Sequence, residues 1–301
     1  MTGFYHESAF YGSDDDFLAL TVPFVEDGLR AGQPTFVACA DQNTALLRGA
    51  LGRDDAVTYL PGTDQYSRPS AAIASYREIC GKLTAAGATR IRVVGEVPHP
   101  GVGVPWDWWA RYEAAVNQAY AEFPLWGLCP YDTRTTPDYV LTDVTRTHPH
   151  IATATDRRPN PDFGATRTAP LPDVLEQGRP LLELVDPTPA EVRCAVSAAI
   201  SAVHLDEDGA HDAVYAASEI ITNGLTHGVG PVLFRLWADA TRVVLSTTDH
   251  GSGPADPLTG LVPTEATKTA GLGLWILHRT CDYVSMGCSE DGFTVRVSVG
   301  S

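Results

Sequence analysis

The 301-residue sequence contains almost no lysine. Only Lys82 and Lys268 are lysines, so the other nineteen of the 21 basic residues are arginines. Acidic residues number 37, and the formal net charge is −16. This excess argues against direct binding to nucleic acid or to anionic membranes, because most of the surface would repel phosphate.

Long apolar runs and export signals are also missing. No segment approaches the ~20 consecutive apolar residues that a transmembrane helix needs. The first residues, MTGFYH, contain neither the basic cluster nor the apolar core of a secretory signal. Six widely spaced cysteines form no C-x-x-C pair, which favours reduced thiols. We therefore expect a cytoplasmic protein.

Length and composition indicate two domains. A chain of 301 residues can form two separate cores. Residues 152–180 are rich in proline and polar residues and show little apolar periodicity, which predicts an interdomain linker. The predicted domains are residues 1–151 and 181–301.

The first domain alternates apolar strands with helical patterns. This order predicts an α/β fold with a parallel sheet covered on both faces, where ligands bind beyond the carboxyl ends of the strands. The expected strands are Phe36–Cys39, Val57–Leu60, Ile91–Gly95 and Leu125–Cys129, and the expected helices are 14–31, 41–51, 69–86 and 105–122.

The second domain has a different order of elements. Successive strands joined by short turns predict a mostly antiparallel sheet with helices on one face, an α+β sandwich. The expected strands are 181–185, 231–238, 242–248, 283–287 and 292–299, and the expected helices are 188–202, 209–227 and 271–280.

Three motifs in the second domain suggest chemistry. Glu219, Asn223 and His227 are four residues apart and share one stripe of a helix, which could also simply face water. Asp249 ends a strand and precedes two glycines, so it could accept a hydrogen bond from an adenine amino group or form an ordinary turn. Gly271-Leu272-Gly273 opens a helix, whose free N–H groups suit phosphate.

The order of these motifs resembles the GHKL (Bergerat-fold) ATPases, with their N box, G1 box, ATP lid and G2 box. The string from Ser218 to Gly228 is most similar to the anti-sigma factor serine kinases. The resemblance covers about residues 181–299. Gly224 stands where these kinases often have alanine.

The resemblance implies a role for each matching residue. Glu219 would be the general base, and Asn223 would coordinate Mg²⁺ beside the ATP phosphates. Asp249 would bind the adenine amino group, and Thr294 would lie near the base. Lys268 would either contact phosphate from the lid or be a solvated loop residue. The remaining expected ATP-binding residues are His227, Gly251, Gly253, Gly271, Leu272 and Gly273.

The first domain resembles the MEDS sensory family. The resemblance runs from about residue 4 to residue 149, and it implies sensing of small organic molecules on a RecA-like sheet. The sequence has no G-x-x-x-x-G-K-[ST], so no P-loop is expected there. The strings that carry it are Phe4-Tyr5-His6, Phe10–Ser13, Pro23–Leu29, Val93–Glu96, Tyr112-Glu113 and Leu128–Asp132.

Five residues are candidates for a sensory pocket: His6, Tyr11, Glu96, Cys129 and Tyr131. His6, Glu96 and Cys129 are expected at strand ends, where they could form one polar or metal-binding site or have separate structural roles. His148 and His150 are expected to be exposed at the domain edge.

Together these features predict a two-domain regulator. The resemblance implies that it binds ATP and Mg²⁺, sequesters a sigma factor and phosphorylates a serine of an anti-anti-sigma (STAS-type) protein, under control of a signal at the first domain. The sequence is compatible with a homodimer and does not determine the oligomeric state.

Three alternatives remain. One is an ATP-binding module without turnover, and another is an independent small-molecule enzyme in the first domain. A sensor histidine kinase is disfavoured, because His211 lies only eight residues before Glu219 and leaves no room for a dimerisation hairpin.

Overall fold

The computed structural model describes residues 3–52, 56–102, 106–164, 172–256, 258–262 and 272–300. The chain divides into two compact units, residues 1–167 and 168–301. This boundary falls inside the segment that was predicted to be a linker.

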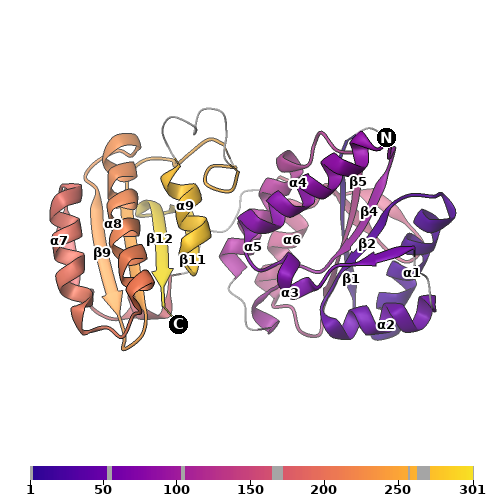
Figure 1. The fold of residues 1–301 in the computed structure, drawn as a ribbon, viewed down its shortest axis with the longest axis horizontal. Coiled ribbons are helices and arrows are strands. Elements are labelled where there is room, and N and C mark those ends of the chain that lie inside the picture. Colours follow the sequence, from indigo (N-terminus) through magenta and orange to yellow (C-terminus); the bar gives the residue numbers. More distant parts are fainter. Residues whose placement is uncertain are drawn as a thin grey trace. The chain divides into compact units, whose positions relative to one another are not determined.

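The first unit contains a sheet with the strand order β3-β2-β4-β5-β1-β6-β7 (Figure 1). All neighbours are parallel except β6 and β7, which are antiparallel. The predicted parallel sheet is therefore confirmed, with β1 and β6 added at positions that the apolar pattern did not indicate. The strands are β1 (Tyr5–Tyr11), β2 (Thr35–Ala38), β3 (Val57–Tyr59), β4 (Ile91–Gly95), β5 (Leu125–Asp132), β6 (His150–Ala152) and β7 (Arg157–Pro159).

Helices cover both faces of this sheet, with α1 and α2 on one side and α4, α5 and α6 on the other (Figure 1). α1 begins at Ser13, whose hydroxyl accepts a hydrogen bond from Asp16 N, and three aspartates fill its first turn. The Ser13 hydroxyl satisfies one of the free N–H groups of the first turn, and the negative aspartates interact favourably with the positive end of the helix dipole. The helices are α1 (Asp14–Arg30), α2 (Asp41–Leu51), α3 (Gly62–Gln65), α4 (Pro69–Ala85), α5 (Trp106–Ala119) and α6 (Asp138–Thr147), with a 3₁₀ turn η1 (Pro100–Val102).

The second unit contains an antiparallel sheet with the order β11-β12-β10-β9-β8. α7, α8 and α9 pack on one face of it, where Ile220, Phe234 and Val297 are fully buried (Figure 1). The predicted α+β sandwich is confirmed. Its elements are η2 (Val174–Gln177), β8 (Leu182–Val185), α7 (Pro189–Ala199), η3 (Ile200–Ala202), α8 (Glu207–His227), β9 (Leu233–Ala238), β10 (Val243–Asp249), α9 (Gly273–Thr280), β11 (Tyr283–Ser289) and β12 (Gly292–Val299).

The segment predicted as a linker, residues 152–180, contributes structure to both units. Its first part extends the first sheet through β7. Its last part packs on the second sheet, where Glu176 pairs with Arg296 of β12. Asp173 likewise pairs with Arg242, and Arg157 pairs with Glu7 of β1, so these charged residues of the segment are paired in the fold, which composition alone could not indicate.

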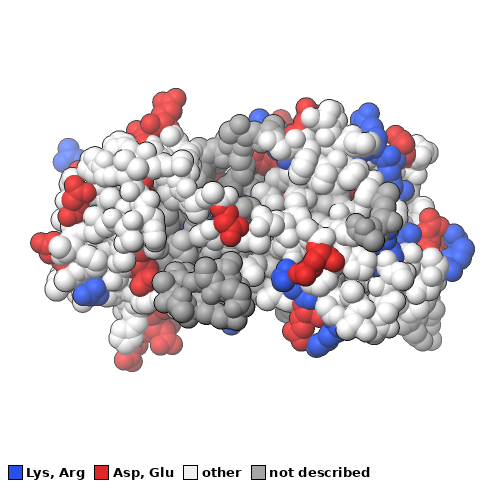
Figure 2. All heavy atoms as spheres, turned by 90° about the horizontal axis from the view of Figure 1, so that it is seen from above, with Lys and Arg blue, Asp and Glu red and all other residues white. Residues whose placement is uncertain are grey.

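None of the described helices is both long enough and apolar enough to cross a membrane. Acidic side chains are scattered over the face shown in Figure 2 and do not gather into one patch on it. Their spacing agrees with the general excess of acidic residues in the sequence.

The Glu176–Arg296 pair gives a stability prediction, because Arg296 is only 6% exposed. Glu176→Ala should destabilise the second unit by about 3 kcal/mol, since it leaves a buried guanidinium without its carboxylate. The matched control is Glu183→Ala, which breaks an exposed pair with Arg235 and should cost at most about 1 kcal/mol. Hydrogen exchange of the β10 and β12 amides in the full chain measures both. Equal effects would show that residues 172–180 do not stabilise this unit.

Candidate functional site

One side of α8 carries the predicted polar stripe. Asn223 and exposed His227 line a cavity of about 450 Å³ that α8 forms with β10 and β12. Glu219 is half-buried one turn earlier on the same helix. The sequence interpretation of this helix as a site element, rather than as a solvated face, agrees with the cavity.

Asp249 ends β10 at the rim of this cavity. Its Oδ1 accepts hydrogen bonds from Val229 N (3.0 Å) and Gly251 N (2.7 Å). A Cβ at Gly228 would lie 2.5 Å from Asp249 Cγ, and one at Gly251 would lie 2.7 Å from Oδ1. Only glycine therefore fits at both positions. Among the described residues Oδ2 accepts no hydrogen bond, so it is available to a donor in the cavity.

The cavity walls are largely apolar, which suits a flat heterocyclic base. Gly253 has a positive φ of 72° and lies directly against the ring of Phe293, where no Cβ could be placed. Sequence reasoning missed these walls, although the alternation in residues 292–299 could have revealed them. The apolar lining includes Met286, Phe293 and Val295.

Thr294 does not lie in this cavity, contrary to the prediction. Its hydroxyl is 2.8 Å from that of Thr248, and both residues line a separate hollow on the opposite face of the sheet. The reason is that successive side chains of a strand point to opposite faces, so Phe293 and Val295 line the cavity while Thr294 lies on the other face.

The carboxylate of Glu219, on α8, lies next to Gly273, the first residue of α9. A Cβ at Gly273 would overlap its carboxylate, so glycine is required at this point. Burial raises the pKa of Glu219. Leu272 is exposed at the N-cap of α9, while Lys268 and Gly271 lie outside the described residues.

Asn223 has a buried side-chain nitrogen that forms no hydrogen bond within the described part of the chain. Asn223 lines the cavity, and because the oxygen and nitrogen of an amide are nearly indistinguishable, either atom can occupy this buried position. This fits an asparagine that binds a cation and phosphate. The next residue, Gly224, allows close packing, because a Cβ there would lie 2.8 Å from Val232 Cγ1.

In the first unit, the five candidate residues of the sensory pocket form two groups. His6 of β1 lies on one face of the sheet with Cys129 and Tyr131 of β5, because the register places these alternate residues side by side. Tyr11 has the opposite parity and lies on the other face, in the core with α1.

Glu96 belongs to the Tyr11 group and does not meet His6 and Cys129. Asn43 connects them, since its amide nitrogen is 3.0 Å from both Tyr11 Oη and Glu96 Oε1. Glu96 also accepts a hydrogen bond from Ala40 N (2.9 Å). Burial raises the pKa of Glu96. Of the two alternatives left open for His6, Glu96 and Cys129, a single site shared by all three is therefore excluded, because Glu96 lies in the other group.

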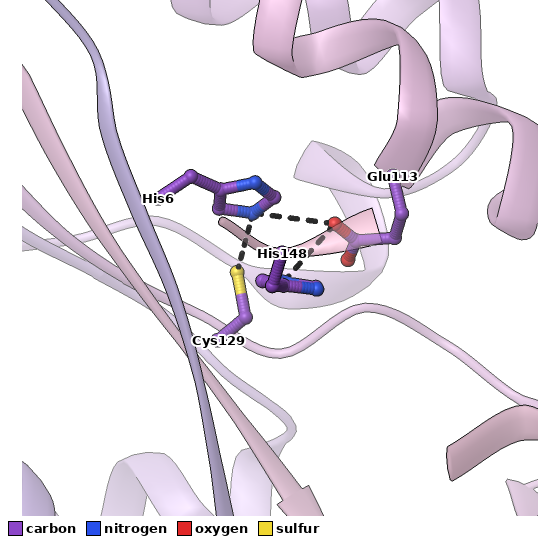
Figure 3. Close-up of side chains that lie close together, drawn as sticks. All are labelled: His6, Glu113, Cys129 and His148. Atoms are coloured by element: carbon purple, nitrogen blue, oxygen red, sulfur yellow. Dashed lines mark hydrogen bonds and ion pairs between the residues drawn. The ribbon is translucent and has the colours of Figure 1, made fainter. Parts of the chain in front are cut away.

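His6 and Cys129 instead meet Glu113 of α5 and His148, which follows α6 (Figure 3). Tyr131 donates a hydrogen bond to Glu113 Oε1 (2.7 Å). His148 is fully buried, so the expectation that it is exposed was wrong. Burial lowers the pKa of His148 to about 3 and raises that of Cys129.

Glu113 was missed as a site residue, yet the sequence contained a signal for it. It lies four residues after Trp109 and three before Val116, both buried, so a carboxylate interrupts the apolar stripe of α5. A charge in such a stripe needs a partner.

Comparisons with known proteins agree with this division of the chain. The family model described as "MEDS: MEthanogen/methylotroph, DcmR Sensory domain" matches residues 5–149, and that of the histidine kinase-like ATPase domain matches residues 185–299. No curated protein gives a significant match.

One solved structure, described as a crystal structure of Oryza sativa TDC with PLP, is 14% identical with a TM-score of 0.29. The match covers 96% of this chain and 63% of that one. Such a low score supports no conclusion about fold or function. The two family models, in contrast, show that the chain carries an N-terminal MEDS sensory domain followed by a C-terminal histidine kinase-like ATPase domain.

Proposed function

We propose that this protein is a cytoplasmic regulatory kinase of the anti-sigma type. It binds ATP with Mg²⁺, holds a sigma factor, and phosphorylates a serine of an anti-anti-sigma protein of the STAS type. A signal molecule that binds the sensory domain more tightly in one of two states of the protein shifts the ATPase domain from one partner to the other. The observation that carries the proposal is the unsatisfied buried amide of Asn223 beside Asp249 in one cavity.

Each described site residue has a role in this proposal. Asp249 Oδ2 accepts the adenine amino group while Oδ1 remains bound to the backbone. Asn223 would hold Mg²⁺ through its side-chain oxygen, and the ion would neutralise charge on the phosphates.

Glu219 is the proposed general base. Its carboxylate takes the proton of the substrate serine as the serine oxygen bonds to the γ-phosphorus. The bond from that phosphorus to the bridging oxygen breaks, and ADP leaves. The raised pKa of Glu219 suits this role, because a more basic carboxylate accepts the proton more readily.

Base recognition is tested by two substitutions on opposite faces of one sheet. Asp249→Asn should weaken Mg·ADP binding at least about tenfold, because a hydrogen bond to a charged group contributes ~1.5–3 kcal/mol. Thr294→Val should change affinity less than about twofold, because Thr294 faces away from the cavity. Calorimetry on the full chain measures both. A Thr294→Val loss as large as that of Asp249→Asn would contradict the assignment.

Phosphoryl transfer is tested with radiolabelled ATP and a panel of STAS-type proteins. Glu219→Gln should lower labelling about 100-fold or more, the usual contribution of a general base, while Mg·ADP affinity stays unchanged. The control is Glu207→Gln, an exposed carboxylate in the first turn of the same helix, which should label normally. Equal labelling by the wild type and Glu219→Gln would exclude Glu219 as the base.

The pH dependence of transfer gives a further check. Glu219 accepts a proton only when it is ionised, so the rate should rise with pH and be lost as the pH falls through the pKa of Glu219. Burial raises that pKa, so the loss should occur above the ~4.3 of an ordinary glutamate. Single-turnover labelling between pH 4 and 8 tests this, and a rate that is flat across this range would contradict it.

A further inference from the structure

Four buried side chains from distant parts of the chain converge in the sensory domain (Figure 3). His6 comes from β1, Glu113 from α5, Cys129 from β5 and His148 from the end of α6. Each offers one ligand atom, and these four atoms all lie within 4.8 Å of one another. None of the four residues is more than 8% exposed.

The spacing of these atoms suits a tetrahedral ion. His6 Nε2 lies 3.3 Å from Glu113 Oε2 and 3.4 Å from Cys129 Sγ, and His148 Nε2 lies 3.4 Å from Glu113 Oε2. Ligands at about 2.1 Å from a tetrahedral zinc ion are about 3.4 Å apart. Three of the six ligand pairs therefore already have the separation that a bound ion imposes.

The outer hydrogen bonds turn both imidazoles toward the centre. His148 Nδ1 lies 2.8 Å from the carbonyl oxygen of Val144, which can only accept, so Nδ1 carries the proton and Nε2 a lone pair. His6 Nδ1 lies 3.1 Å from Asn117 Oδ1, and the Asn117 amide nitrogen is fixed by the carbonyl of Thr147 at 2.8 Å. His6 thus also presents a bare Nε2. Such partners of the far ring nitrogen are typical of metal-binding histidines.

Without a cation the centre of the cluster is short of donors. The two Nε2 lone pairs and the Glu113 carboxylate all accept, and the Cys129 thiol is the one donor that these four side chains supply. Glu113 Oε2 and His148 Nε2 accordingly have no hydrogen-bond partner among the described residues. Buried acceptors that face one another are unfavourable unless a cation lies between them.

Charge and donor type identify the kind of ion. Glu113 and a Cys129 thiolate carry two negative charges, which neutralise a divalent cation in this buried position. Two imidazoles, one thiolate and one carboxylate suit zinc, whereas Mg²⁺ and Ca²⁺ prefer oxygen ligands. The ion of this cluster is therefore chemically distinct from the Mg²⁺ expected in the ATPase domain.

We propose that His6, Glu113, Cys129 and His148 form a binding site for one divalent transition-metal ion of the zinc class. A small hollow lined by Tyr66, Tyr76, Tyr112 and Tyr120 adjoins the cluster, and His6, Glu113 and Cys129 also line it, so the ion lies beside an aromatic hollow of the sensory domain. The proposal is independent of the kinase assignment, because it concerns the other structural unit.

Cobalt provides the test, because a tetrahedral Co²⁺ thiolate site absorbs strongly. The full chain carries Cys194→Ala and Cys288→Ala to remove the exposed thiols, is stripped with a chelator and is kept free of nucleotide. One equivalent of Co²⁺ should produce tetrahedral d–d bands and a thiolate charge-transfer band, and one equivalent of Zn²⁺ should abolish them. Absence of these bands would overturn the proposal.

Variants locate the site. Cys129→Ala should remove the charge-transfer band, and His148→Gln should weaken Co²⁺ binding at least about tenfold, since loss of an outer partner alone costs that much. The matched controls are Cys80→Ala, a buried thiol elsewhere in this domain, and His150→Gln, and both should bind as the parent does. A charge-transfer band that persists in Cys129→Ala would overturn the assignment.

X-ray absorption on the zinc-loaded parent protein needs no site variant that could misfold. The proposal predicts one sulfur ligand and three nitrogen or oxygen ligands around zinc. A zinc spectrum without sulfur would contradict it.

Discussion

Buried polar atoms need partners, and both candidate sites lie where the protein leaves some of them unsatisfied. Asn223 Nδ2 lacks a partner among the described residues of the ATPase domain, and so do Glu113 Oε2 and His148 Nε2 in the sensory domain. An unsatisfied buried group costs ~1–3 kcal/mol, so a ligand gains most by binding at these points. The two sites differ in chemistry: an amide and a carboxylate around a base and a hard cation, and nitrogen and sulfur donors around a softer one.

Most of the fold could be predicted from local apolar patterns. Strands β2 to β5 and helices α2, α4 and α5 followed from their sequences, because their buried faces are apolar, whereas the four-residue helix α3 was not predicted. β1 could not, since it contains His6, Glu7 and Ser8, all buried in the centre of the sheet. Glu7 Oε1 accepts hydrogen bonds from Trp126 and Arg157, which are 119 and 150 residues away, while Oε2 has no hydrogen-bond partner among the described residues. Periodicity along the chain contains no information about such distant partners.

The candidate sites divide in the same way. The stripe of α8 and the aspartate that ends β10 were predictable because helix and strand geometry fix their spacing. Thr294 was misplaced by one residue, which in a strand means the opposite face. The sensory cluster was half predicted: His6 and Cys129 were named, but Glu96 was chosen in place of Glu113 and His148. Only the packing of α5 and α6 on the sheet brings those two to the cluster.

Nucleotide binding in the cavity between α8, β10 and β12 is the step on which the proposed function depends. A crystal structure of the full chain with Mg·ADP tests it most directly. We expect the adenine amino group at hydrogen-bond distance from Asp249 Oδ2, the ring against Phe293, and Mg²⁺ bound by Asn223. Nucleotide bound elsewhere, or in this cavity with no contact to Asp249 and Asn223, would contradict it.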